Sequence, residues 1–128
     1  MQDFISKQKP KPMKESELQK LVLSWFDTKL GYFVFRTYTG PIIHRNKTMS
    51  PNPQAGFPDL FGFSPKNIPF AIELKSATGK LSDKQKVWIK NLRSKGVFCL
   101  VARDLDTIQK LFGDPNDPSH FTHQQIDD

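Results

Sequence analysis

The chain has 128 residues, and its 19 Lys and Arg against 13 Asp and Glu give a net charge of +6 at pH 7. A chain of this length forms one domain with a hydrophobic core of its own. No apolar run approaches the length of a membrane span, and the basic N-terminus lacks the apolar block of a signal peptide, so we expect no membrane association. The single Cys99 excludes a disulfide framework and favours the reducing cytoplasm.

The first half of the chain predicts a disordered start, a helix, a strand and a long loop. Residues 1–13 are rich in Lys, Gln and Pro and are expected to be a disordered basic segment. Apolar residues recur at helical spacing over 15–30, and aromatic and β-branched residues over 32–38 predict the first strand. Residues 39–55 are polar and contain several prolines, which predicts a mobile functional loop.

The domain is expected to span residues 14–113, and its second half alternates apolar runs with turns. The predicted elements are strands at 59–63 and 70–75, a helix at 82–95 with Val87, Trp88 and Leu92 facing the core, a strand at 97–102, a helix at 105–112 capped by Asp104, and a C-terminal tail at 114–128. The order α-β-β-β-α-β-α predicts an α/β fold, with a mixed β-sheet flanked by α-helices. The strand–helix–strand unit also predicts a right-handed crossover, which makes its two strands parallel.

Two carboxylates and an ammonium group occur on the two middle strands. Asp59 opens one apolar run, and Glu73 and Lys75 stand at the end of the next. Because successive side chains in a strand point to opposite faces, Glu73 and Lys75 share one face. Charged groups inside such an apolar strand are costly to bury unless they bind something. The pattern therefore predicts a functional site, in preference to a simple turn at Asp59 or a solvated pair on an edge strand.

The Asp…Glu-x-Lys pattern is the signature of the PD-(D/E)xK nucleases, and its surroundings resemble the VRR-NUC family of that superfamily. The motifs that carry the resemblance are Gly56-Phe-Pro-Asp, Ala71-Ile-Glu-Leu-Lys-Ser and Ser82-Asp-Lys-Gln. The resemblance extends over residues 15–112. It implies a restriction-endonuclease-like core and a stand-alone protein of the phage and bacterial type, acting on DNA in the cytoplasm of a bacterial cell or an infected host.

Asp59 and Glu73 carry hard oxygen ligands of the kind that Mg²⁺ and Mn²⁺ prefer. The backbone carbonyl of Leu74 is expected to be a further ligand, as the resemblance also implies. The metal would polarise the scissile phosphate and lower the pKa of a bound water. Lys75 is expected to position that water and to stabilise charge on the phosphorus. Together these groups predict hydrolysis of a phosphodiester.

The resemblance also implies an acidic residue from the first helix, for which Glu15 and Glu17 are the candidates. Glu15 lies nearer the apolar face and pairs with Gln19 one turn later, so it is preferred to Glu17 as a catalytic metal ligand. Either glutamate would also be a favourable charge at the helix N-terminus. Gln85 has two compatible interpretations, as an active-site residue and as the partner of Ser82 in a capping box.

Basic residues surround the motif, whereas no acidic residue occurs between Asp27 and Asp59. Lysine and arginine hold a DNA backbone while carboxylates hold a metal, although a solvated lysine-rich surface would have the same composition. The residues expected to bind DNA are Arg36, His44, Arg45, Lys47, Lys80 and Lys84.

The motifs and the resemblance together predict a Mg²⁺- or Mn²⁺-dependent endonuclease that cuts branched DNA, such as Holliday junctions, in DNA repair. A flap or restriction-like duplex nuclease would use the same residues, and a DNA-binding module with a silent nuclease fold is the non-enzymatic alternative. Resolving a four-way junction needs two symmetric cuts, so we expect a homodimer. The chain has more aromatic residues than one small core easily buries, which supports the dimer. These residues are Phe33, Phe35, Phe61, Phe63 and Phe98.

Overall fold

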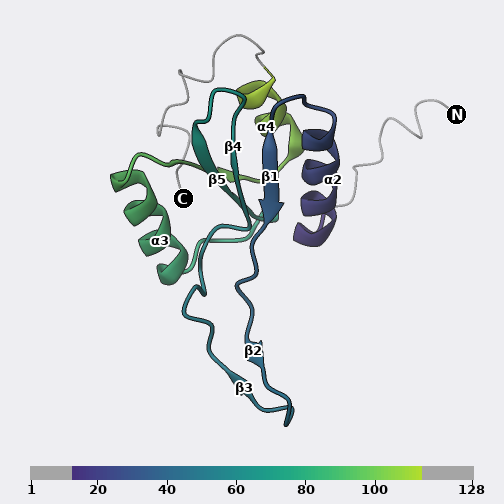
Figure 1. Cartoon of the computed structure of the whole chain (residues 1–128). Helices are drawn as coiled ribbons and strands as arrows, with labels where there is room; N and C mark the ends of the chain where they lie inside the picture. Colours follow the sequence, from purple (N-terminus) through teal and green to yellow (C-terminus); the bar gives the residue numbers. More distant parts are fainter. Residues whose placement is uncertain (1–12, 114–128) are drawn as a thin grey trace, which may run out of the picture.

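The structure is a computed structural model that describes residues 13–113, so the expected basic segment (apart from Met13) and the expected tail lie outside the described residues. In chain order the elements are α2 (Glu15–Asp27), β1 (Phe33–Arg36), β2 (Ile42–Ile43), β3 (Met49–Ser50), β4 (Leu60–Phe63), β5 (Pro69–Leu74), α3 (Asp83–Ser94), β6 (Phe98–Ala102) and α4 (Leu105–Phe112) (Figure 1). Apart from the short pair β2–β3, this order confirms the predicted α-β-β-β-α-β-α fold. No helix in the described range is long and apolar enough to cross a membrane.

A mixed sheet with the strand order β1-β4-β5-β6 forms the centre of the domain. β1 pairs antiparallel with β4 and β4 with β5, whereas β5 and β6 are parallel. The parallel pair is the one that the strand–helix–strand unit predicted. β5 is buried from Phe70 to Leu74, and every residue of β6 is buried. Glu73 therefore lies on an interior strand of the sheet and not at its edge.

Helices cover both faces of this sheet (Figure 1). α2 and α4 pack on one face, through a cluster that includes Val22 and Phe112. α3 packs on the other face, where Ile89 contributes to a smaller cluster with Ala71. Side chains along β5 alternate between the two faces, so Glu73 follows Ala71 on the side of α3.

α2 ends at Asp27, earlier than the residue 30 that the apolar spacing predicted. The Thr28 hydroxyl donates to the Trp25 carbonyl at 2.6 Å, and such a side-chain bond competes with continuation of the helix. Leu30 is consequently 98% exposed. Gly31 follows with a φ of 87°, a left-handed value that favours glycine.

α3 has nearly the predicted bounds, but the prediction of its inner face was partly wrong. Val87, expected in the core, is 57% exposed, and Ile89 is the buried residue instead. Trp88 and Leu92 are partly buried. Three consecutive apolar residues span more than half of the helix circumference, so the position of the sheet decides which of them turns inward.

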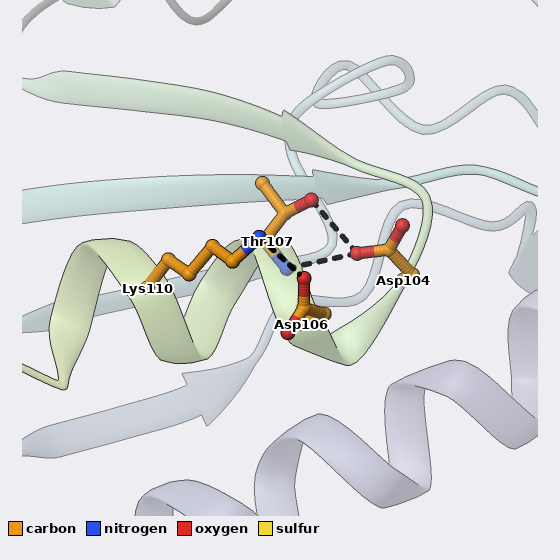
Figure 2. A network of polar contacts seen from close by, with 4 residues as sticks. All are labelled: Asp104, Asp106, Thr107 and Lys110. Carbon is orange, nitrogen blue, oxygen red and sulfur yellow. Dashed lines mark hydrogen bonds and ion pairs between the residues drawn. The ribbon is translucent and has the colours of Figure 1, made fainter.

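α4 begins at the predicted N-cap (Figure 2). Asp104 Oδ1 accepts hydrogen bonds from the Thr107 amide at 2.8 Å and from the Thr107 hydroxyl at 2.7 Å. These bonds hold the pKa of Asp104 below its usual value. Asp106 pairs with Lys110 at 2.9 Å on the exposed face of the helix. Both carboxylates therefore have partners three or four residues away in the sequence, at the start of α4.

Residues 39–55, predicted as a loop, instead form an arm that contains the antiparallel hairpin β2–β3 and projects from the sheet (Figure 1). In its turn, the His44 amide donates to the Thr48 carbonyl at 2.9 Å. Near its base, the Asn52 side chain donates to the Tyr38 carbonyl at 3.2 Å and so joins the two sides of the arm. Strands of two residues are too short to show an alternating pattern, which is why the sequence did not predict this hairpin.

Candidate active site

The start of β4 and the end of β5 lie side by side because these strands are antiparallel, with Leu60 opposite Ile72. Asp59 directly precedes β4, and Leu74 is the last residue of β5. The Asp59 Oδ2 atom accepts a hydrogen bond from the Leu74 amide at 2.8 Å. The structure therefore brings Asp59 together with the Glu-Leu-Lys segment at one end of the sheet.

Glu73 is a buried carboxyl group, with only 2% of its surface exposed. Its Oε2 atom accepts a hydrogen bond from Gln85 Nε2 at 2.8 Å, while its Oε1 atom has no hydrogen-bond partner. Burial raises the pKa of Glu73 to about 9, with a further rise from Asp59 that Lys75 opposes. An ionised carboxylate in this position needs a nearby cation to compensate for its lost hydration.

The donor atoms at this end of the sheet suit a hard divalent cation. Buried polar atoms in folded proteins nearly always have a partner, and a cation would provide one for Glu73 Oε1. Within residues 13–113, no group of three or more His, Cys, Asp or Glu side chains is arranged to hold a metal ion. Mg²⁺ commonly binds one or two carboxylates and keeps several waters. The two carboxylates of Asp59 and Glu73 fit that coordination, in which water supplies the other ligands.

Glu15 approaches the same end of the sheet from α2. A cavity of about 220 Å³ is lined by Glu15, Ser16, Gln19, Asp59 and Leu74. A methyl group at Gly79 would lie 3.6 Å from the Glu15 carboxylate and 3.5 Å from Lys75 Cδ, so these two side chains approach each other there. Glu17 does not line this cavity. Of the two candidates on α2, the structure places Glu15 beside Asp59.

Gln85 forms the capping box that the sequence predicted and also contacts Glu73. The backbone amide of Gln85 donates to Ser82 Oγ at 3.2 Å. In return, Gln85 Oε1 accepts from the backbone amide of Ser82 at 2.8 Å, which completes the capping box. Its remaining Nε2 atom donates to Glu73. The carboxamide oxygen therefore helps to fix the start of α3, while the nitrogen of the same carboxamide orients the buried Glu73 carboxylate.

Arg103, which no sequence motif singles out, supports the segment that follows Lys75. Its Nη1 atom donates to the carbonyls of Ser76 at 2.7 Å and Gly79 at 2.5 Å. The parallel register of β5 and β6 brings the residue after β6 next to the residue after β5. An arginine after a strand carries no signal of its own, so only this register reveals the contact.

The predicted DNA-binding residues are all exposed and fall into two groups. The first group lies on elements that adjoin the carboxylates: Arg36 at the end of β1, Lys80 between β5 and α3, and Lys84 in the first turn of α3. The second group lies in the turn of the arm, remote from the sheet (Figure 1): His44, Arg45 and Lys47.

Residues 43–104 of the chain match the family model of the VRR-NUC domain. A solved structure described as a VRR_NUC domain is similar to the chain, with a TM-score of 0.59 and 21% sequence identity, over 80% of this chain and 98% of that chain. No curated protein sequence matches the chain. The segment matched by the family model contains Asp59, Glu73, Lys75 and Gln85, whereas Glu15 lies outside it.

The mixed sheet between its helices and the structural match define a restriction-endonuclease-like fold. The family model that matches residues 43–104 is that of a nuclease-type domain, the VRR-NUC domain. The resemblance drawn from the three sequence motifs is thus confirmed.

Proposed function

We propose that the protein is a Mg²⁺- or Mn²⁺-dependent endodeoxyribonuclease. The observation that supports this most is the buried Glu73 carboxylate, which has an unpartnered Oε1 atom and lies beside Asp59 at the end of the sheet. The VRR-NUC domain, which is of a nuclease type, supports the same conclusion. The reaction breaks one P–O bond of the DNA backbone, and a water molecule supplies the hydroxyl group and the proton to the two new ends.

In this proposal Asp59, Glu73 and the Leu74 carbonyl hold the metal, and Glu15 contributes from α2. A bound divalent ion would polarise the scissile phosphate and lower the pKa of a coordinated water. The Lys75 ammonium group stabilises the negative charge that develops on the phosphate. Gln85 keeps the Glu73 carboxylate in its orientation through the bond to Oε2.

The basic residues of the two groups bind the DNA backbone. A phosphate chain is attracted to basic side chains where no acidic group repels it. The segment from Thr28 to Pro58 contains no acidic residue. Such contacts position the DNA and carry no sequence information. We therefore propose that this protein recognises DNA by shape.

Branched DNA is the substrate that we favour, in DNA repair in the cytoplasm, on the strength of the resemblance to the VRR-NUC family. A flap nuclease or a restriction-like duplex nuclease would use the same catalytic residues. A silent DNA-binding module is less well supported, because Asp59, Glu73 and Lys75 are all present.

Cleavage of labelled four-way junction, flap, duplex and single-stranded DNA, assayed in parallel, tests this proposal. With Mg²⁺ or Mn²⁺ we expect symmetric cuts near the branch point of the junction, and with EDTA we expect none. Faster cutting of the flap or of plain duplex would favour the alternative nucleases. Binding of DNA without cleavage under any of the metal conditions would instead indicate a silent domain.

The exposed face of β1 and β4 supports the proposal of a homodimer. Phe33 and Phe35 lie opposite Phe63 and Phe61, and neighbouring rings along each strand are 5.8 Å apart. Phe33 is 64% exposed, whereas Phe98, also expected to be in excess, is 3% exposed and belongs to the core. A contiguous aromatic surface of this kind is typical of a contact with another protein. A second copy of the chain would supply the matching aromatic surface and the second active site.

Light scattering of the full chain tests the dimer, which we expect in solution or on junction DNA. Phe33→Lys should convert it to a monomer, because a twofold contact brings two copies of the new charge together. Leu30→Lys is the matched control, since Leu30 is 98% exposed and lies outside the aromatic face. A wild-type protein that stays monomeric on junction DNA would contradict both the dimer and the symmetric cuts.

A further inference from the structure

The hairpin of the arm presents large apolar side chains to solvent. Ile43 is 69% exposed and Met49 is 67% exposed. The two residues are directly opposite each other in the antiparallel pair, so their side chains share one face of the hairpin. Their place on a projecting hairpin leaves both of them with most of their surface in water (Figure 1).

Positive charge lies immediately next to this apolar pair. Arg45 and Lys47 occupy the turn that joins β2 to β3, and both are exposed. No acidic residue occurs between Asp27 and Asp59, so the whole arm lacks negative charge. The charge of the arm is complementary to a polyanion, and DNA is the polyanion on which the candidate active site would act.

The base of the arm is connected directly to the candidate active site. The Thr37 amide donates to the Asp59 carbonyl at 2.9 Å, and the Thr37 hydroxyl donates to the Pro58 carbonyl at 2.5 Å. At the other side of the base, Trp88 Nε1 donates to the Ala55 carbonyl at 3.1 Å. DNA whose backbone reaches Asp59 would therefore pass close to the arm.

Hydrogen bonds also hold the arm in one shape. The Asn52 side chain donates to the carbonyls of Tyr38 and Gly40 at 3.2 and 3.0 Å, and the Tyr38 hydroxyl donates to the Pro41 carbonyl at 2.6 Å. In the turn, Asn46 Oδ1 accepts from the Thr48 amide at 3.1 Å. A preorganised hairpin loses little conformational entropy when it binds, so more of its contact energy is available to deform a ligand.

From these observations we propose that Ile43 and Met49 insert between adjacent bases of the bound DNA and unstack them. Arg45 and Lys47 hold the phosphates on either side. Apolar side chains that enter a base step lose their contact with water, which offsets part of the stacking that the DNA loses. This inference rests on the proposed function and extends it, because it assigns the arm the role of opening the bound DNA.

The test uses the full-length protein and four-way junctions that carry a single 2-aminopurine at each position next to the branch point, with matching duplexes. The fluorescence of this base rises when it is unstacked, and EDTA prevents cleavage during the measurement. We expect a rise at one or two positions when wild-type protein saturates the DNA. Saturation without a rise at any position would overturn the proposal.

Two pairs of substitutions separate insertion from phosphate binding. Ile43→Ser with Met49→Ser should remove most of the fluorescence rise at saturation, whereas Leu30→Ser, at a site 98% exposed outside the arm, should keep it. Arg45→Gln with Lys47→Gln should weaken binding and reduce the salt slope by about 2, while the rise at saturation remains. A full rise with the serine pair, or an unchanged salt slope with the glutamine pair, would contradict the assigned roles.

Two further measurements distinguish a failure of this inference from a failure of the proposed function. Light scattering shows whether the serine pair turns a dimer into a monomer, in which case the arm contacts protein and the proposal fails. The same preparations are assayed for cleavage of unmodified junctions with Mn²⁺. Cleavage by wild-type protein without base unstacking would overturn the role of the arm alone. A protein that neither binds nor cuts any DNA would overturn the proposed function as well.

Discussion

Replacing Glu73 by alanine is expected to lower the rate of DNA cleavage by about 10³-fold or more, because a catalytic metal contributes several kcal/mol to transition-state stabilisation. DNA affinity should remain close to that of the wild type, since binding depends on phosphate contacts. Asp59→Ala should have the same effect on the rate. Single-turnover cleavage and fluorescence anisotropy measure the two quantities separately. A variant of either residue that cuts at the wild-type rate would show that the active site lies elsewhere.

The Asp59 position needs a control variant that separates loss of charge from loss of a hydrogen bond. Asp59 accepts a hydrogen bond from the Leu74 amide, so alanine leaves that amide without its partner. Asp59→Asn can keep this bond and still removes the negative charge, so it should fold as the wild type does while losing activity. Equal loss of activity in the alanine and asparagine variants would assign the effect to charge and not to misfolding.

Glu73 also gives the stability of the metal-free protein a defined dependence on pH. Its pKa is raised from 4.5 to about 9 in the folded protein, so the folded state favours the protonated form. The stability that this group contributes is fully present below pH 4.5 and is lost as the pH rises through 9. Glu73→Gln mimics the protonated form, so in EDTA it should raise Tm at pH 8 and change it little at pH 5. A lower Tm at pH 8 would contradict the raised pKa of Glu73.

The parts of the fold that the sequence predicted correctly are those built from apolar runs of ordinary length. Phe98 to Ala102 reads as a buried strand from its composition, and the structure has this strand. The arm could not be predicted, because its strands contain two residues each and depend on turn and side-chain hydrogen bonds. The prediction for the inner face of α3 was partly wrong for another reason. Val87 and Ile89 are similar apolar residues on the same helix, and only the position of the sheet decides which of them is buried.

Within the candidate site, the sequence identified groups that are close along the chain and missed contacts that depend on packing. Glu73 and Lys75 were assigned to one face from their spacing in a strand. The bond from Gln85 to Glu73 requires α3 to lie over β5, so the sequence predicted an active-site role for Gln85 without predicting this contact. The support from Arg103 depends on the register of two parallel strands, which no local pattern records. Charge and periodicity therefore indicate the candidate reactive groups, while tertiary structure shows the residues that contact and support them.

Lys75→Ala is expected to lower the turnover rate by about 10²-fold or more, which is the usual loss when a preorganised group that stabilises transition-state charge is removed. The affinity for Mn²⁺ should change much less, because two effects oppose each other. The ammonium group lowers the pKa of Glu73 and so favours the ionised form that binds a metal. It also repels the incoming cation. Removing the group cancels both effects.

Isothermal titration with Mn²⁺ and single-turnover cleavage of the same preparations separate the two quantities. Lys80→Ala is the matched control, since Lys80 is an exposed lysine of the neighbouring loop and is assigned here to phosphate binding. It should raise KM and leave kcat unchanged, whereas Lys75→Ala should lower kcat. Lys75→Arg keeps the charge but changes its shape and reach, so it should restore only part of the rate. A normal kcat in Lys75→Ala would assign stabilisation of the phosphate charge to another cation near the carboxylates, with Lys80 or Lys84 as the next candidates to replace.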